Sequence, residues 1–437
     1  MPINPKDVRR QAVVIIHGMG EQRPNSTIRG FTRCLLGELH SQTNRLPKSY
    51  EKPDKISGTF ETRSKTILKD DLAGRPTTHV YEFYWAHHMR DTKGSQVWRW
   101  VLRLLFWKPR CVPPRLKKVF WTLWGLVVLG LALGIAIAVN YWDFGTKWRI
   151  ISGISWVGAL WGAIRGILNP LILNTLGDAA RYMSDNPDNI EQRQKIRQEG
   201  VDLLRRLHEA VDELGQPLFD RVVVASHSLG TVVAYDLLRL AWVQYSETFD
   251  NKVPPFVNGA LKTMEADGFE PGADYPDLQH ACWSAQREAG NRWRVTDFVT
   301  MGAPLAYFEY LIVGSGKEFR QRVDEREYPT CPPVKDPKYA LHWSTSRPGY
   351  TQKIDLLSYH ALFACIRWTN LYFATDFIGG PLKPVLGQGI CDVEVPVPWR
   401  RLKELLPYPF GHTDYWSDGE SDYYAMDKIT EALKLNC

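Results

Sequence analysis

The chain has 437 residues, a formal net charge of +6 and 23% charged residues. Seven scattered cysteines without a Cys-x-x-Cys pair argue against a disulfide framework and a zinc site, and they indicate a reducing compartment. The N-terminus shows no apolar signal region, and no tract of basic and stacking aromatic residues indicates a nucleic-acid partner. The length exceeds that of one ordinary domain, which predicts insertions or additional segments.

The N-terminal part alternates between predicted strands and a helix. Apolar, β-branched residues 12–16 predict a buried strand, and the glycine-rich loop His17-Gly18-Met19-Gly20 follows it. A serine-capped helix with one regular apolar face is expected over residues 26–39. Residues 59–68 and 78–85 alternate in polarity as strands do. These elements are typical of an α/β protein.

Two adjacent histidines, His87 and His88, come directly after these strands. On an extended segment, adjacent side chains point to opposite faces, so the pair is a poor metal site. The sequence therefore predicts neither a metal nor a cofactor.

The next segment predicts contact with a membrane. Residues 97–107 combine Trp, Leu and Arg in an amphipathic pattern that suits a helix in the bilayer interface, although packing against protein is the alternative. Residues 119–139 are uncharged and would span roughly 30 Å as a helix, the hydrocarbon thickness of a bilayer. A second apolar run, residues 150–173 with the single charge Arg165, follows the connection 140–149. We expect a transmembrane helical hairpin over residues 119–173; a buried α-hairpin or a hydrophobic lid is the alternative.

Glycine spacing and charge indicate how such a hairpin is arranged. Gly-x-x-x-Gly repeats at Gly130 and Gly134 and at Gly158, Gly162 and Gly166 favour close helix packing, within the hairpin or between copies of the chain as a homo-oligomer. Seven basic residues lie in residues 99–118, whereas the connection between the spans has two. Because positive charge stays on the cytoplasmic side, both flanks are expected to face the cytoplasm.

A strand, a sharp turn and a helix are predicted over residues 221–236. The buried strand 222–225 leads into Ser226-His227-Ser228-Leu229-Gly230, and an apolar helix follows over residues 231–240. Such a turn lifts the Ser228 hydroxyl above the sheet edge at a helix N-terminus. Small residues are needed on either side, and Ser226 stands where a glycine is usual. A serine that merely caps the helix is the alternative.

This turn resembles the nucleophile turn of the serine α/β-hydrolases, which include lipases, esterases and acyl-transfer enzymes. The resemblance covers residues 11–39 and 221–425. It implies that the loop of His17, Gly18 and Gly20 supports an oxyanion hole, with the backbone N–H groups of Met19 and Leu229 as donors. By the same resemblance, Ser226 and Gly230 are the small residues that allow the sharp turn at the nucleophile Ser228.

In this family an acid and a histidine follow the serine in chain order. Asp376 comes after the predicted strand 367–373, and His412 lies in a loop beyond the predicted last strand, residues 392–397. Asp392 is the reserve candidate for the acid. Asp297 falls in the wrong strand, and Asp414 is too close to His412 along the chain. We therefore predict the catalytic residues Ser228, Asp376 and His412.

The expected fold is an α/β-hydrolase fold, a mostly parallel sheet flanked by helices, with an inserted transmembrane hairpin. Residues 1–96 and 174–437 would form the hydrolase domain, residues 97–118 a basic juxtamembrane segment, and residues 306–352 a cap. Helices are also expected over residues 189–214 and 354–366, whereas residues 40–57 and 245–293 are expected to be irregular. The glycine-rich loop that begins at His17 precedes the insertion in sequence, and Ser228 follows it. Because both must reach one active site, the chain must cross the membrane an even number of times.

The predicted function is that of a membrane-anchored serine ester hydrolase with its catalytic domain in the cytoplasm. Its expected partners are the lipid bilayer and a lipid or lipid-linked ester. Acyl transfer by the same residues and a non-catalytic, membrane-tethered scaffold are the alternatives. The sequence does not distinguish phospholipid, neutral lipid, lipidated protein or thioester as substrate.

Overall fold

The structure is a computed structural model of the chain. It describes residues 8–18, 23–89, 189–246, 259–309, 316–334, 341–345, 354–376, 378–396, 412, 414–416 and 424–435, with isolated residues from 109 to 132 and residue 182. The chain divides into two compact units, residues 1–88 with 190–437, here called the sheet unit, and residues 89–189. All elements below belong to the sheet unit, apart from the last residue of η2.

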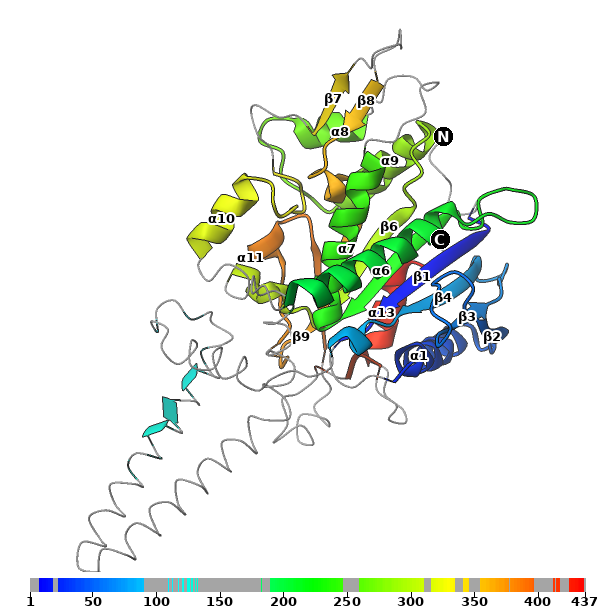
Figure 1. Ribbon diagram of the computed structural model, residues 1–437, viewed down its shortest axis with the longest axis horizontal. Coiled ribbons are helices and arrows are strands. Elements are labelled where there is room, and N and C mark those ends of the chain that lie inside the picture. Colours follow the sequence, from blue (N-terminus) through cyan, green and yellow to red (C-terminus); the bar gives the residue numbers. More distant parts are fainter. Residues whose placement is uncertain are drawn as a thin grey trace, which may run out of the picture. The chain divides into compact units, whose positions relative to one another are not determined.

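An eight-stranded sheet forms the centre of the sheet unit (Figure 1). Its strands are β1 (Arg10–Ile16), β2 (Ser49–Pro53), β3 (Arg63–Ile67), β4 (Thr77–Phe83), β5 (Arg221–His227), β6 (Val295–Met301), β9 (Arg367–Phe373) and β10 (Cys391–Val395). The order across the sheet is β10-β9-β6-β5-β1-β4-β3-β2. The six strands from β10 to β4 run parallel, and β3 and β2 are antiparallel additions at one edge.

Continuous apolar runs explain the central strands. β1 is buried from its second residue onward and β6 throughout, because helices cover both faces of a parallel sheet. The predicted strands at β1, β4, β5, β9 and β10 are confirmed; β9 has the predicted ends, and the ends of the others are shifted by up to two residues. β2 was missed within residues 40–57, because its short polar sequence is half exposed and carries no apolar alternation.

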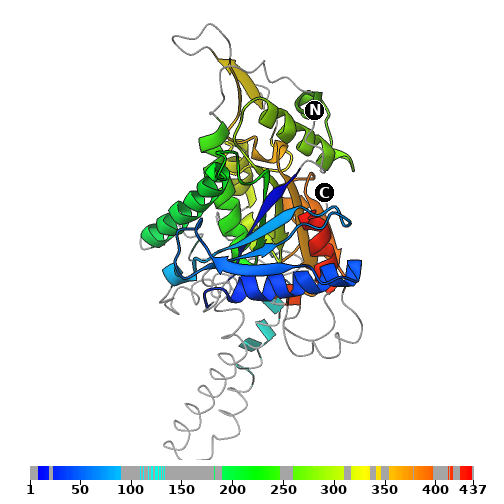
Figure 2. The ribbon, with the colours of Figure 1, turned by 90° about the vertical axis from the view of Figure 1, so that its right-hand side faces the viewer.

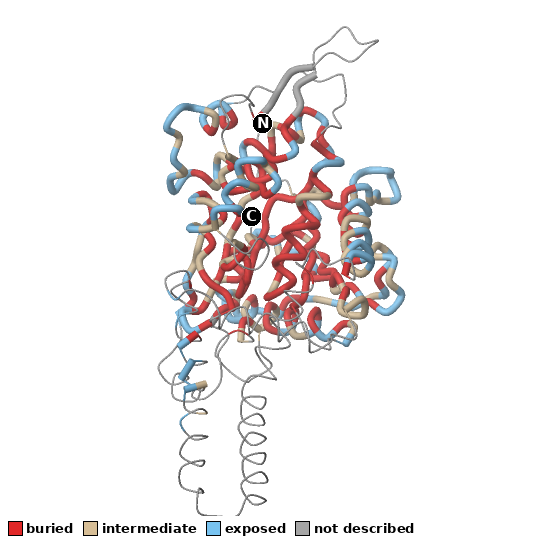
Figure 3. Tube along the Cα trace, turned by 60° about the vertical axis from the view of Figure 1, so that its left-hand side comes forward, coloured by how far each residue is buried: buried red, intermediate tan, exposed pale blue. Residues whose placement is uncertain are grey.

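Helices form a layer on each side of this sheet (Figure 2). α1 (Ser26–Thr43) and α13 (Tyr424–Leu433) pack together on one face, and their buried side chains share one apolar cluster with β1, β5, β6 and β9. α6 (Ile190–Glu209), α7 (Leu229–Ser246) and α9 (Tyr275–Glu288) belong to the other layer. Figure 3 shows that burial is concentrated along the central strands and the helix faces against them. The fold is therefore an α/β fold with a mostly parallel sheet, as expected.

Several local predictions were wrong. Residues 354–366 form β8 (Ile354–Leu357) and the short helix η8 (Leu362–Ala364) instead of one helix. β8 pairs with β7 (His342–Thr345) in a separate two-stranded sheet, so a tertiary partner overrode the local pattern. Within residues 245–293 the structure has α9 and α8 (Gly259–Glu265).

The predicted cap contains described elements of its own. These are α10 (Gly316–Asp324), besides β7, and the last two residues of η6 (Pro304–Tyr307). α11 (Lys383–Leu386), η2 (Ala86–Met89) and η9 (Asp414–Trp416) complete the described elements.

The predicted membrane segments fall largely outside what the structure describes. Residues 97–107 and 150–173 lie entirely outside the described residues, and residues 119–139 do so for the most part. Among the residues that are described, no helix is both long enough and apolar enough to cross a membrane.

Candidate active site

The predicted site residues follow the carboxyl ends of parallel strands. Ile16, at the end of β1, pairs with Ser226, and His227 at the end of β5 pairs with Met301 at the end of β6. Phe373 ends β9 three residues before Asp376. Because these strands run parallel, their ends meet at one edge of the sheet, which is where α/β folds bind ligands.

Ser228 occupies a strained turn between β5 and α7. Its φ of 53° is left-handed, a conformation that costs a non-glycine residue about 1–3 kcal/mol. The Ser228 N–H donates to the Met301 carbonyl at 2.9 Å, and α7 begins at the next residue. The side chain is thereby placed between the end of a buried strand and the N-terminus of a helix.

Two glycines permit this turn. A Cβ on Gly230 would lie 2.3 Å from the His17 carbonyl oxygen, and one on Gly18 would lie 2.7 Å from the Ser228 Cβ. Neither approach is possible with a larger residue. Ser226 replaces the usual glycine without a clash, since its hydroxyl is buried and donates to the Val299 carbonyl at 3.2 Å.

Ser228, His412 and Asp376 form a continuous hydrogen-bonded series. The Ser228 Oγ lies 2.8 Å from His412 Nε2, and His412 Nδ1 lies 3.0 Å from Asp376 Oδ2. All three residues are buried. With the proton on Nδ1, the histidine donates to Asp376 and leaves Nε2 to accept the serine proton. Three residues separated by up to 184 positions are thus brought together in the predicted order.

Asp376 is held in its ionised form. Its Oδ1 accepts the backbone N–H groups of Ile378 at 2.9 Å and Gly379 at 3.1 Å. Burial alone would raise the pKa of this carboxyl, but the charge of His412, its hydrogen bond and the two backbone amides lower the pKa below its usual range. A fixed carboxylate therefore faces the histidine.

Two side chains that the sequence did not indicate hold this series in place. His227 Nε2 donates to the His412 carbonyl at 2.6 Å, and the Tyr415 hydroxyl donates to Asp376 Oδ2 at 3.3 Å. Burial lowers the pKa of His227 to about 3, and nearby His412 acts in the same direction. The His227 ring is therefore neutral. The position of His227 between Ser226 and Ser228 was the one signal in the sequence that could have indicated this role.

Gly302 was also missed, although it directly follows the buried strand β6. It has a φ of 58°, and a Cβ there would lie 3.0 Å from Asp376 Oδ2 and 3.1 Å from His412 Nδ1. This position leaves room for the acid–histidine contact because it carries no side chain.

The glycine-rich loop is fixed through His17. Its Nδ1 donates to the Gly18 carbonyl at 2.7 Å, and Trp85 donates its backbone N–H to His17 Nε2 at 3.3 Å and its indole N–H to the His17 carbonyl at 3.1 Å. Burial lowers the pKa of His17 to about 4, so this ring is also neutral. Met19 and Gly20 lie outside the described residues. Leu229, the other predicted donor, is the first residue of α7, where helix N–H groups lack intrahelical partners.

The rival acids have other partners. Asp392 accepts the backbone N–H groups of Leu382 and Lys383 at 2.9–3.0 Å and so caps α11. Asp297 forms a bidentate pair with Arg367, with both contacts at 2.8 Å. Burial opposes ionisation of Asp297, but Arg367 outweighs it and lowers the pKa to about 2. Both carboxylates serve the fold.

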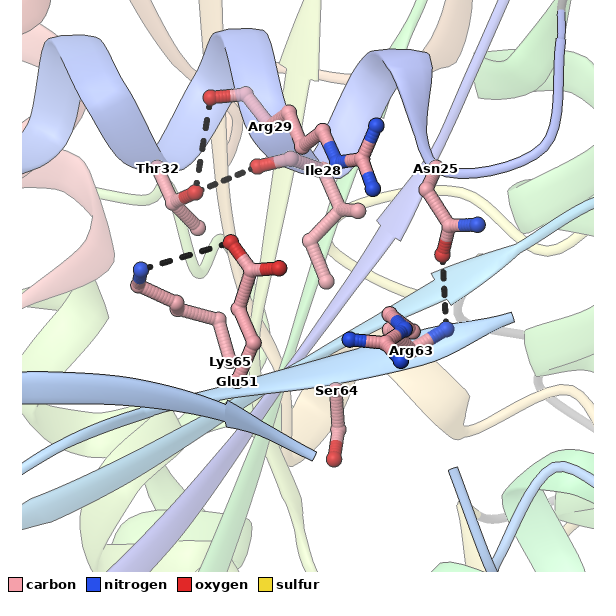
Figure 4. Close-up of a pocket in the computed structure, with 8 residues that line it drawn as sticks. All are labelled: Asn25, Ile28, Arg29, Thr32, Glu51, Arg63, Ser64 and Lys65. Atoms are coloured by element: carbon pink, nitrogen blue, oxygen red, sulfur yellow. Dashed lines mark hydrogen bonds and ion pairs between the residues drawn. The ribbon is translucent and has the colours of Figure 1, made fainter. Parts of the chain in front are cut away.

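A pocket lies elsewhere, between α1 and the β2–β3 edge (Figure 4). Its lining groups bond among themselves: Asn25 accepts the Arg63 N–H at 2.6 Å, and Lys65 lies 3.4 Å from Glu51. None of Ser228, His412 and Asp376 lines it. We interpret this pocket as a packing irregularity between helix and sheet edge.

Comparisons with models of protein families, with curated proteins and with solved structures found no match for this chain. The functional interpretation therefore depends on the geometry of the site.

Proposed function

We propose that this protein is a serine hydrolase of the α/β-hydrolase type that cleaves carboxylic esters. The observation that carries the proposal is the hydrogen-bonded series from Ser228 through His412 to Asp376. The strained φ of Ser228 supports it, because strain at a buried serine between a strand and a helix has no evident structural use. The close approach of Gly18 supports it as well.

The geometry suits a two-step acyl transfer. Ser228 Oγ attacks the ester carbonyl carbon while His412 Nε2 takes its proton, and Asp376 stabilises the imidazolium that forms. The Leu229 N–H, at the start of α7, is the proposed donor to the developing oxyanion. His412 then returns the proton to the leaving alcohol. Water, activated by the same histidine, releases the acid and restores Ser228. Neutral His17 and His227 place no competing positive charge beside the imidazolium.

A fluorophosphonate probe tests this assignment, because such probes react with activated serines. We expect wild-type protein to be labelled at Ser228 and Ser228→Ala to lose both labelling and about 10⁶ of esterase turnover. The matched variant Ser226→Gly, which introduces the usual glycine, is expected to keep labelling. Labelling and turnover of Ser228→Ala at wild-type levels would refute the proposal. A wild-type protein that reacts with neither the probe nor esters would favour a non-catalytic scaffold.

We further propose that residues 119–173 form a membrane hairpin and that the ester is lipid or lipid-linked. The support is the uncharged run of residues 119–139 together with the basic residues before it. Among the described side chains of that run, Phe120 is buried, whereas Trp121, Trp124 and Val128 are exposed, as lipid-facing groups would be. An insertion within the catalytic fold would hold the site at the cytoplasmic leaflet, where acyl chains are concentrated.

Replacing residues 119–173 with a Gly/Ser linker tests the lipid proposal. We expect turnover of a soluble short-chain ester to persist and turnover on phospholipid vesicles to fall. Equal retention of both activities would contradict a lipid substrate while leaving the serine hydrolase assignment intact. Acyl transfer would be recognised by adding acceptor alcohols and measuring the transferred product.

A further inference from the structure

We propose that His87, His88 and Glu199 bind one divalent transition-metal ion of the Zn²⁺ type. The expectation that the two histidines lie on an extended segment was wrong, since both belong to the short 3-10 helix η2, which is separated by two residues from the end of β4. The ring centroids of His87 and His88, which are consecutive residues of this helix, are 3.8 Å apart. Glu199 comes from α6, on the far side of the insertion in sequence.

The three side chains already converge. One ligand atom from each of the three residues lies within 4.8 Å of the other two, and His88 Nε2 is 2.8 Å from Glu199 Oε2. In a tetrahedral Zn²⁺ site with bonds of about 2.0–2.1 Å, donor atoms are separated by about 3.4 Å. Small side-chain rotations would close that difference. Two imidazoles and a carboxylate are a donor set that Zn²⁺ commonly takes, with water as a fourth ligand.

An ordinary ion pair does not account for the whole arrangement. The contact between His88 and Glu199 uses one imidazole, and the His87 ring lies beside it with a centroid separation of 3.8 Å. A metal ion would use one nitrogen of each ring together with a Glu199 oxygen as its donors. The side chains of His88 and Glu199 are 13% and 49% exposed, so an ion can reach them.

The position of this cluster gives the ion a structural task. The sheet unit ends at His88 before the inserted unit and resumes at Ile190, so the three ligands flank both junctions of the insertion. An ion held here would join the end of β4 to α6. His87 also stacks on Tyr84 at 5.4 Å, and Tyr84 contacts His17 at 5.6 Å. The cluster is therefore connected through rings to the loop beside Ser228.

Cobalt binding to the full chain, purified without a polyhistidine tag and freed of metal by a chelator, tests the proposal. We expect one equivalent of Co²⁺ to give the intense visible absorption of a four-coordinate ion, and Zn²⁺ to displace it. Competition with a chromophoric chelator gives the affinity. Glu199→Gln and His88→Ala should each weaken Zn²⁺ binding by about 100-fold or more.

His40→Ala, which removes an exposed histidine on α1, is the matched control and should bind like wild type. Zn²⁺ should also raise the melting temperature of wild type and of His40→Ala but not that of Glu199→Gln. Glu199→Gln is isosteric at a half-exposed position, so its folding is not in question. Absence of cobalt absorption, or equal affinity in wild type and in both ligand variants, would overturn the proposal. None of these readouts depends on esterase activity.

Discussion

A Cβ atom on residue 18 would lie 2.7 Å from the Cβ of Ser228, so Gly18 and Ser228 are in contact at the level of the backbone. Such a separation essentially never occurs between real side chains. The contact places the glycine-rich loop directly against the proposed nucleophile, although Gly18 and Ser228 are 210 positions apart in the sequence.

Gly18→Ala should lower esterase kcat by about 100-fold, because the added methyl group must displace either the loop or Ser228 by a fraction of an ångström. Gly259→Ala, where a Cβ would meet nothing within 4 Å, is the control. Steady-state kinetics and circular dichroism of both variants would be compared. Undiminished kcat in a folded Gly18→Ala protein would show that the loop does not take part in the reaction.

Asp376→Asn should lower kcat by about 10⁴-fold while preserving the fold, because an amide no longer stabilises the Nδ1-protonated histidine and its imidazolium. Asp392→Asn should retain kcat, since Asp392 caps α11 and bonds to backbone N–H groups. In each variant one carboxylate oxygen is replaced by an amide nitrogen, so the two changes are matched. If Asp392→Asn were the inactive one, the acid would have to be reassigned.

His227→Ala should lower kcat by about 10-fold, because the hydrogen bond to the His412 carbonyl is worth about 1 kcal/mol and its loss frees the loop that carries the base. Gln has a terminal N–H group that can reach the same carbonyl, so His227→Gln should recover most of the activity. The pH dependence of kcat/KM should keep its shape in both variants, since neutral His227 does not titrate in the working range. A shifted acidic limb would instead mean that His227 ionises.

Glu82→Gln should stabilise the protein at alkaline pH. Burial raises the pKa of Glu82 from 4.5 to about 7, against the hydrogen bond from the Ile28 N–H. The folded state thus holds this proton more tightly than the unfolded state, and stability is lost as pH rises from 4.5 through 7. The difference corresponds to about 3 kcal/mol.

Denaturant unfolding at pH 4 and pH 8 checks this prediction. Glu82→Gln should resemble wild type near pH 4 and exceed it at pH 8, whereas the exposed-site variant Glu213→Gln should follow wild type throughout. Parallel curves for all three proteins would show that Glu82 ionises normally in the folded state.

Local signals in the sequence were sufficient for the central strands and for the order of the site residues. Buried parallel strands such as β1 and β6 are continuous apolar runs, and the turn around Ser228 has its own small residues at fixed positions. Asp376 and His412 could be named because they follow strands in a known order. These features depend on neighbours within a few residues along the chain.

The remaining features depend on contacts between distant segments, and only the tertiary structure decided them. The pairing of β8 with β7 replaced an expected helix, and the contact between Asp376 and His412 joins two loops that are 36 positions apart in sequence. His227 and Tyr415 bond to groups up to 185 residues away. The convergence of His87 and His88 with Glu199 likewise spans 111 positions. Parallel strands and loop contacts leave no periodic trace in either partner, because each partner's burial is determined by a segment far away in sequence.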